Sequence, residues 1–371
     1  MLAVLSGGGT AGHINPALAL AEELRERGWE VKFAGTPQGV EARLVPQAGV
    51  DFTAFEASGF DRAHPLSLVK GVGKIAASTR KAKQWFKEIK PDVVVGFGGY
   101  VSIPVARAAE ATGVPVVVHE QNSVMGMANK YLARRAKAVC LTYDHSAKAL
   151  DAGVPVKVTG NPVRRSVIEA DRAAGRELFG LADDDFMLLV FGGSLGARHI
   201  NEALVGLKDE LLSRPRLHVV HITGPKELDA VTEALALTPE QQKRWHLMGY
   251  QDRMGETMAA ADAIVSRAGA TSLAEISARA IPAVLVPFPY ATEDHQTTNA
   301  RAYVDAGCAY MVADADLDSE EFSRAVMTLI DDASVRATME RAARAQKTNE
   351  AAAHLADVVV AAASEGGHAI Q

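Results

Sequence analysis

Short hydrophobic runs alternate along the chain with longer amphipathic runs. In the first half the short runs read LAVLS, EVKFAG, PDVVVGFGG, VPVVVHEQ, KAVCLT and VPVKVTGN, with helical patterns between them. The second half starts the alternation again with FMLLVFGG, RLHVVHITG, HLMGY, DAIVSRAG, IPAVLVPFP and AYMVAD. Strands that alternate with helices predict parallel sheets covered on both faces. We therefore expect an α/β protein with two doubly wound, Rossmann-like domains.

The restart of the pattern places a domain boundary near the segment TGNPVRRSV, residues 159–167. A chain of 371 residues is also long enough for two cores. We expect an N-terminal domain over 1–162 and a C-terminal domain over 163–345. A last helical run, 349–366, is expected to pack back on the first domain. Because open sheets bind ligands at the carboxyl ends of their strands, the site is expected in a central cleft that both sheets face.

Composition excludes several classes of protein. A net charge of −6 argues against a nucleic-acid partner. The two cysteines, Cys140 and Cys308, lie in apolar runs, so a disulfide framework is not expected. No signal-peptide pattern and no uninterrupted apolar run of about 18 residues occurs. These features predict a cytoplasmic protein without a membrane span.

The stretch LAVLSGGGTAGHINPALALAEEL, residues 2–24, places glycines between a strand and a helix. The glycines at 7, 9 and 12 fit the dinucleotide pattern G-x-G-x-x-G, and Asn15 and Pro16 suggest that the helix starts there. A dinucleotide enzyme needs an acidic residue at the end of the second strand, where Gly35 and Thr36 stand instead. The pattern therefore predicts an anion site at a helix N-terminus, or a tight turn without a ligand.

Two further glycine loops follow apolar strands, GFGGYVSIPVA at 96–106 and GGSLGAR at 192–198. Three such loops predict several phosphate-sized anion sites. A pair of substrates with more than one pyrophosphate would fit them.

Seven motifs occur in order: GGGTAGHINPALALA, GFGGYVSIP, HEQN, GNPVR, FGGSLGA, SRAGATSLAE and DHQTTNA. In order and spacing they resemble the MurG family, over nearly the whole chain. The resemblance implies a GT-B fold and no required cofactor or metal. It also implies inverting transfer of N-acetylglucosamine from UDP-GlcNAc to the C4 hydroxyl of undecaprenyl-pyrophosphoryl-N-acetylmuramoyl pentapeptide, which converts lipid I to lipid II in peptidoglycan synthesis.

The resemblance also implies roles for residues at matching positions. In the donor site Glu275 would accept the ribose hydroxyls, and Gln251 would lie where main-chain atoms read uracil. Gly8, Gly9, Gly99 and Tyr100 would form the acceptor's pyrophosphate loops. The full donor set is Thr10, Ala11, Gly12, Asn122, Arg164, Ser194, Gln251, Ala270, Thr271, Ser272, Leu273, Ala274, Glu275 and Gln296.

Transfer to a hydroxyl needs a general base, and His13 at the mouth of the first loop is the main candidate. The ordinary histidine pKa of about 6.5 suits proton removal near neutrality. His13 could instead only cap the helix or bind pyrophosphate. Glu120 and the neighbouring His119 are rival bases, although His119 equally fits a buried histidine at a strand end.

The segment DAD at 314–316 looks like a metal-binding D-x-D pattern. Asp318 and Glu321 follow at once and resemble a capping box, so we interpret the segment as helix capping and expect no metal.

The run 66–90 carries seven Lys or Arg and one Glu, with apolar residues at helical spacing. An ordinary core helix with a solvated basic face would look the same. A lipid-linked acceptor favours docking on anionic lipid, as a peripheral protein of the cytoplasmic face of the plasma membrane. The residues expected to face the membrane are Lys70, Lys74, Arg80, Lys81, Lys83 and Trp85.

Three other functions fit parts of the sequence. A UDP-sugar epimerase of similar fold would need no lipid acceptor and no basic helix. A dinucleotide-dependent oxidoreductase lacks the expected ribose carboxylate. A nucleotide-binding scaffold without catalysis is the third.

Overall fold

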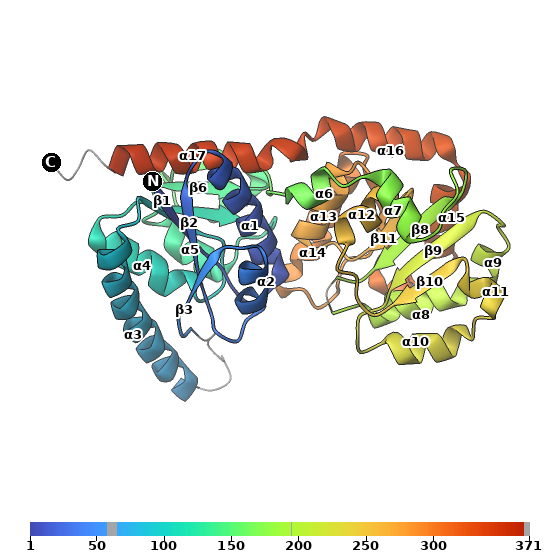
Figure 1. Ribbon diagram of the computed structural model, residues 1–371, viewed down its shortest axis with the longest axis horizontal. Helices are drawn as coiled ribbons and strands as arrows, with labels where there is room; N and C mark the ends of the chain where they lie inside the picture. The colour runs from blue at the N-terminus through green and yellow to red at the C-terminus, as the bar shows by residue number, and fades with distance from the viewer. Residues whose placement is uncertain (58–64, 194, 367–371) are drawn as a thin grey trace. The chain divides into compact units, whose positions relative to one another are not determined.

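The computed structural model describes residues 1–57, 65–193 and 195–366, and for residues 65–72 it describes the backbone alone. The chain divides into two compact units, Met1–Arg164 with Asn349–Gln371, and Arg165–Thr348 (Figure 1). Each unit has its own parallel sheet. Among the described residues, no helix is both long and apolar enough to cross a membrane.

The N-terminal unit alternates strands and helices as the sequence predicts. Its elements are β1 (Leu2–Ser6), α1 (Ala11–Glu26), β2 (Glu30–Gly35), α2 (Glu41–Gln47), β3 (Asp51–Ala54), α3 (Pro65–Ile89), β4 (Val93–Gly96), α4 (Ser102–Thr112), β5 (Val116–Glu120), α5 (Met127–Ala133), β6 (Ala138–Leu141), the 3-10 helix η1 (Asp144–Ala149), β7 (Val156–Val158) and, at the end of the chain, α17 (Ala351–Gly366).

The seven strands of this unit pair in the order β3-β2-β1-β4-β5-β6-β7, all parallel. The order reverses between β1 and β4, because the chain first adds strands on one side of β1 and then on the other. In doubly wound sheets this reversal marks the usual ligand position, beyond the carboxyl ends of the two strands.

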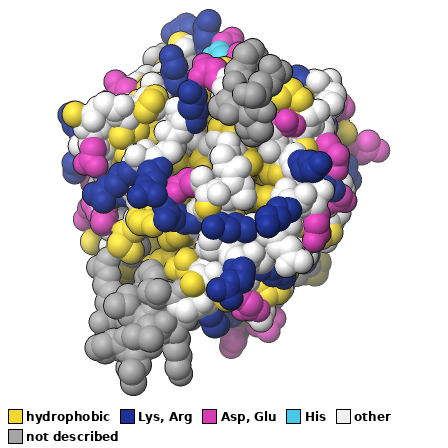
Figure 2. Space-filling model, turned by 90° about the vertical axis from the view of Figure 1, so that its left-hand side faces the viewer, with side chains coloured by type: hydrophobic (Ala, Val, Ile, Leu, Met, Phe, Trp, Pro, Cys, Tyr) yellow, Lys and Arg dark blue, Asp and Glu magenta, His cyan; other side chains and the backbone are white. Residues whose placement is uncertain are grey.

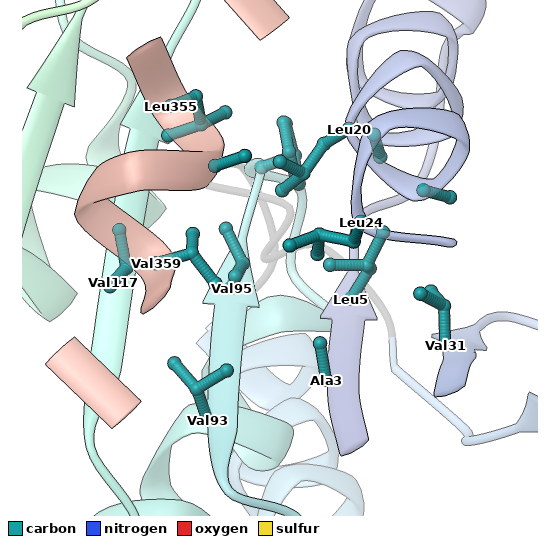
Figure 3. Close-up of a cluster of buried hydrophobic side chains, with 14 of the residues drawn as sticks. Ala3, Leu5, Leu20, Leu24, Val31, Val93, Val95, Val117, Leu355 and Val359 are labelled. Carbon is teal, nitrogen blue, oxygen red and sulfur yellow. The ribbon is translucent and has the colours of Figure 1, made fainter. Parts of the chain in front are cut away.

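Helices cover both faces of this sheet. On one face α1 and α17 pack on the central strands, with Leu20, Leu355 and Val359 against Val95 and its neighbours (Figure 3). On the other face Ala82 and Phe86 of α3 join buried residues of α4 and α5 in a second cluster. Helix α17, although last in the sequence, therefore belongs to the core of the first unit.

The C-terminal unit repeats the plan. Its elements are α6 (Arg165–Ile168), α7 (Arg172–Leu178), β8 (Phe186–Phe191), α8 (Arg198–Gly206), α9 (Lys208–Leu212), β9 (Leu217–Ile222), α10 (Leu228–Leu235), α11 (Pro239–Gln242), β10 (Trp245–Met248), α12 (Met254–Ala260), β11 (Ala263–Ser266), α13 (Ala270–Ala278), β12 (Ala283–Leu285), η2 (Thr292–Asp294), α14 (His295–Asp305), β13 (Ala309–Met311), η3 (Asp314–Asp316), α15 (Glu320–Asp331) and α16 (Ala333–Ala345), after which η4 (Thr348–Glu350) leads to α17.

The second sheet has six parallel strands in the order β10-β9-β8-β11-β12-β13. Its order reverses between β8 and β11, as the first sheet reverses between β1 and β4. Residues of α8, α10, α15 and α16 form one core cluster with its strands. The prediction of two doubly wound parallel-sheet units is confirmed.

Two helix starts differ from the expectation. Helix α1 begins at Ala11 with Thr10 as N-cap, so Asn15 and Pro16 lie inside it. Proline there removes one helical hydrogen bond without ending the helix. The earlier start places His13 on the first turn of α1. Ser319, whose side chain accepts from the Glu321 N–H, caps α15 in place of the expected Asp318.

Candidate functional site

The switch point of the N-terminal sheet carries two glycine loops in direct backbone contact. The first follows β1 and contains Gly8 and Gly9, and the second follows β4 and contains Gly99 and Tyr100. Gly99 has a φ of +78°, and a Cβ atom on it would lie 2.5 Å from the carbonyl oxygen of Gly8. Glycine is therefore needed for this approach. The structure brings together the loops expected to bind the acceptor's pyrophosphate.

His13 is held by the first of these loops. Its Nδ1 lies 2.8 Å from the carbonyl oxygen of Gly8. A carbonyl oxygen can only accept, so Nδ1 carries a proton, and in the neutral ring Nε2 is the proton acceptor. A Cβ atom on Gly98 would lie 3.1 Å from Nε2, so this nitrogen lies beside the second loop. Thr10 and Gly9 next to it are exposed.

Glu120, the rival base, is buried and saturated with hydrogen bonds. Its Oε1 accepts from the backbone N–H of Asn122 at 3.0 Å and from the Asn122 side chain at 3.2 Å. Its Oε2 accepts from the Gly126 N–H at 3.0 Å and from Asn129 Nδ2 at 2.8 Å. Four donors fix the carboxylate in place. Glu120 thus holds the loop that presents Asn122.

Both ring nitrogens of His119 are hydrogen-bonded within the protein. Its side chain is completely buried, and Nε2 donates to the carbonyl oxygen of Gly160 at 2.9 Å. The Gln121 side chain donates to Nδ1 at 3.0 Å. Burial lowers the pKa of His119 to about 4, so the ring is neutral near pH 7. The structure supports the interpretation of His119 as a buried strand-end histidine.

The carboxyl edge of the C-terminal sheet also carries glycine loops. Gly196, after β8, and Gly224, after β9, both have positive φ, and a Cβ on Gly196 would lie 2.0 Å from the Thr223 carbonyl oxygen. Ser194, expected in this loop, lies outside the described residues. After β11, helix α13 begins at Ala270 and contains Thr271, Ser272, Leu273 and Ala274, so its N-terminal N–H groups lie at the same edge of the sheet.

Gln296 connects the loops that follow β11 and β12. Its Oε1 accepts from the Ala268 N–H at 3.2 Å and from the Phe288 N–H at 3.0 Å. The side-chain oxygen is therefore occupied by the protein, and the Nε2 amide is the part of Gln296 suited to donate to a sugar hydroxyl.

The other expected donor residues take varied positions. Glu275 lies on α13 and is only 8 % exposed. The Gln251 side chain accepts from the Arg253 N–H, so it is engaged within its own loop. Arg164 ends the N-terminal unit, and its Nε is buried with no hydrogen-bond partner among the described residues.

Asp314, the first aspartate of DAD, takes part in an ion-pair network. It contacts the guanidinium of Arg267, and His199 Nδ1 lies 2.9 Å from its Oδ2. Burial favours a higher pKa for Asp314, but the bonds from His199 and Arg267 outweigh it and hold the pKa below its usual range. Residues 1–57, 65–193 and 195–366 contain no group of three or more His, Cys, Asp or Glu side chains placed to hold a metal ion.

Comparisons with known proteins match both units. The model of the glycosyltransferase family 28 N-terminal domain matches residues 3–141, and that of the family 28 C-terminal domain matches residues 187–355. A protein of Leuconostoc mesenteroides is 42 % identical over 346 residues, 93 % of this chain and 94 % of its own length. One of Pediococcus pentosaceus is 39 % identical over 97 % of this chain and 99 % of its own length. Both are named UDP-N-acetylglucosamine–N-acetylmuramyl-(pentapeptide) pyrophosphoryl-undecaprenol N-acetylglucosamine transferase.

The chain belongs to the MurG family. The crystal structure of Acinetobacter baumannii MurG, at 29 % identity, covers 96 % of this chain with a TM-score of 0.72. The calicheamicin glycosyltransferase CalG4 matches with a TM-score of 0.68 at 19 % identity, which shows the fold alone. The GT-B fold class expected from the MurG resemblance is confirmed.

Sequence reasoning missed several residues that shape these loops of the MurG fold. Glu41 accepts from the N–H of Gly9, and Asn129 donates to Glu120. In the C-terminal unit, Arg267 donates to the Pro287 carbonyl oxygen at 3.1 Å and stacks on Phe288. One signal was available for Arg267, because a charged residue directly after a buried strand at a switch point faces the ligand edge. Glu41 gives no comparable signal in the sequence.

Proposed function

We propose that this chain is an inverting glycosyltransferase that moves N-acetylglucosamine from UDP-GlcNAc to the C4 hydroxyl of lipid-linked N-acetylmuramoyl pentapeptide. The observation that carries the proposal is the likeness to relatives named for this transfer, over more than nine-tenths of this chain and of theirs. Glycine loops at the carboxyl edges of both sheets add support, because donor and acceptor each contain a diphosphate.

The proposed reaction uses His13 as general base. Nε2 takes the proton of the C4 hydroxyl, and the oxygen attacks the anomeric carbon of the donor sugar from the side opposite UDP. The bond between that carbon and the phosphate oxygen breaks, and UDP leaves with the electron pair. The N–H groups at the start of α13 stabilise the growing negative charge on the diphosphate.

The donor is proposed to lie on the C-terminal unit. Glu275 accepts the ribose hydroxyls, Gln296 donates through Nε2 to the sugar, and main-chain atoms near Gln251 bind uracil. From the N-terminal unit, Asn122 and Arg164 are proposed as further donor contacts. Gly8, Gly9, Gly99 and Tyr100 hold the acceptor's pyrophosphate.

Peripheral docking on the cytoplasmic face of an anionic membrane is part of the proposal. Lys and Arg side chains gather in a band, beside hydrophobic side chains, on the face of the N-terminal unit that carries α3 (Figure 2). On α3, Lys74 and Arg80 are exposed and Lys83 is partly exposed. Such a surface suits anionic lipid, and it would bring the site to a lipid-linked acceptor.

Two of the expected membrane-facing residues have partners within the protein. Trp85 is partly buried, with its ring 5.4 Å from that of Phe55. Lys81 donates to the Ala54 carbonyl oxygen at 2.9 Å. The side chain of Lys70 lies outside the described part of the chain.

The experiment that tests the function is transfer of radiolabel from UDP-GlcNAc to undecaprenyl-pyrophosphoryl-MurNAc-pentapeptide in detergent. We expect label in the lipid fraction, and only when the acceptor is present. Conversion of UDP-GlcNAc to another UDP-sugar without the acceptor would identify an epimerase instead. Calorimetric titration with UDP and with NAD tests the two remaining alternatives. A dinucleotide-dependent oxidoreductase would bind NAD. A non-catalytic scaffold would bind UDP but would transfer no sugar.

A further inference from the structure

Glu41 is a buried carboxylate that the proposed reaction does not use. It is the first residue of α2, and its side chain is completely buried at the carboxyl edge of the N-terminal sheet. Glycines make room for it, because a Cβ on Gly8 would lie 2.7 Å from Glu41 Oε1 and a Cβ on Gly35 would lie 2.6 Å from its Cγ. Burying a carboxylate is costly in free energy unless hydrogen-bond donors surround it.

The donors to Glu41 come from two different loops. Oε1 accepts from the Thr36 N–H at 3.0 Å and from the Thr36 hydroxyl at 2.6 Å. Oε2 accepts from the N–H of Gly9 at 3.3 Å. Glu41 therefore joins the end of β2 to the glycine loop between β1 and α1.

The same loop holds His13. Glu41 fixes the N–H of Gly9, and the carbonyl oxygen of the preceding residue, Gly8, accepts from His13 Nδ1 at 2.8 Å. A shift of the Gly8–Gly9 peptide would weaken this bond. His13 would then lose the constraint that keeps the proton on Nδ1 and leaves Nε2 as the acceptor.

We infer that Glu41 is a positioning residue, which holds the Gly8–Gly9 peptide and through it fixes the orientation and tautomer of His13. The inference rests on the proposed function only where it links the tautomer to catalysis. Its geometric part concerns the free protein and is tested without substrate.

Glu41→Gln is the sharpest variant because it keeps the shape of the side chain. A carboxylate accepts at both oxygens, whereas an amide accepts at one and donates at the other. The amide oxygen should face Thr36, which offers two donors, and the N–H of Gly9 then faces the NH2 group. Thr36→Val is the matched control, because it removes a hydrogen bond to Glu41 and leaves the Gly9 bond in place.

The experiment measures the His13 tautomer by 15N NMR of the full-length, histidine-labelled protein at pH 8.5, where free histidine is neutral. A His13→Asn spectrum assigns the signal. The wild type and Thr36→Val should show the proton on Nδ1, and Glu41→Gln should show a mixture of tautomers. With UDP-GlcNAc and the lipid-linked acceptor, Glu41→Gln should lower kcat at least about tenfold and change the donor KM less than about twofold.

A wild-type tautomer in Glu41→Gln would overturn the inference, whatever happens to the activity. An equal loss of kcat in Thr36→Val would also overturn it, since Glu41 would then only stabilise the fold. If the tautomer changes in Glu41→Gln and kcat does not, the positioning role stands and the assignment of His13 as base fails. The two failures are thus distinguishable.

Discussion

His13 Nδ1 lies 2.8 Å from the carbonyl oxygen of Gly8, so the loop proposed to bind pyrophosphate also orients the proposed base. One carbonyl oxygen of this loop faces the imidazole, and the N–H of Gly9 in the same peptide donates to Glu41. If this loop binds the acceptor's pyrophosphate as proposed, that binding and the orientation of His13 are coupled through the Gly8–Gly9 peptide.

If His13 is the base, His13→Ala should lower kcat by at least about a hundredfold, because proton removal from the C4 hydroxyl would lose its acceptor. The donor KM should change little. Steady-state kinetics with both substrates measure this. His354→Ala on α17 is the control, since His354 is a surface residue near Glu350. A loss confined to the acceptor KM would make His13 a binding group and contradict its role as base.

Gln296 offers a test that separates holding the loops from binding the sugar. Gln296→Glu keeps an acceptor for the N–H groups of Ala268 and Phe288 but removes the Nε2 donors. Gln296→Leu removes both functions and should lower the free energy of unfolding by about 1–3 kcal/mol, because it leaves a buried N–H unpaired. We expect Gln296→Glu to retain stability and to raise the donor KM. An unchanged donor KM would remove Gln296 from the donor site.

His119 should make the N-terminal unit less stable in mild acid. Burial lowers its folded pKa to about 4, whereas the unfolded chain binds a proton near the ordinary value of about 6.5. The contribution of neutral His119 to the free energy of unfolding is therefore complete above about pH 6.5 and is lost as the pH falls toward 4. Between pH 7 and pH 5 the free energy of unfolding should fall by about 2 kcal/mol. Denaturation of a Trp245→Phe background, in which fluorescence reports Trp29 and Trp85, measures it. The same pH dependence in His119→Phe would show that another group is responsible.

Charge reversal of α3 tests membrane docking. Lys74→Glu, Arg80→Glu and Lys83→Glu together should weaken binding to anionic liposomes at low salt by roughly a hundredfold or more, since each base near the surface contributes about 1 kcal/mol. Co-sedimentation measures this binding. Lys243→Glu, an exposed lysine of the C-terminal unit, is the control. If binding of the triple variant is unchanged, α3 is an ordinary core helix with a solvated basic face.

The sequence was a good guide to the strands and to the glycine loops, because buried parallel strands are continuous apolar runs and close backbone approach requires glycine. It was a poor guide to the start of α1, since Pro16 suggests a first turn although the helix tolerates it further in. The hydrogen bond between Glu41 and the N–H of Gly9 could not be predicted from the sequence, because it joins residues 32 positions apart.

The three candidate bases also show that the sequence alone does not reveal which side chains are in contact. His119, Glu120 and His13 are all polar residues near strand ends or glycines, and their spacing does not rank them. Their hydrogen bonds differ in the structure: His119 and Glu120 are buried and hydrogen-bonded within the protein, whereas His13 donates through Nδ1 and its Nε2 lies beside a glycine loop.

The most direct test of the account is the structure of the product made from UDP-GlcNAc, in which the sugar is α-linked, and the lipid-linked acceptor. NMR of the released disaccharide should show N-acetylglucosamine in β linkage to C4 of N-acetylmuramic acid, with one UDP formed for each sugar transferred. An α linkage, attachment at another hydroxyl, or release of UDP without a disaccharide would contradict it.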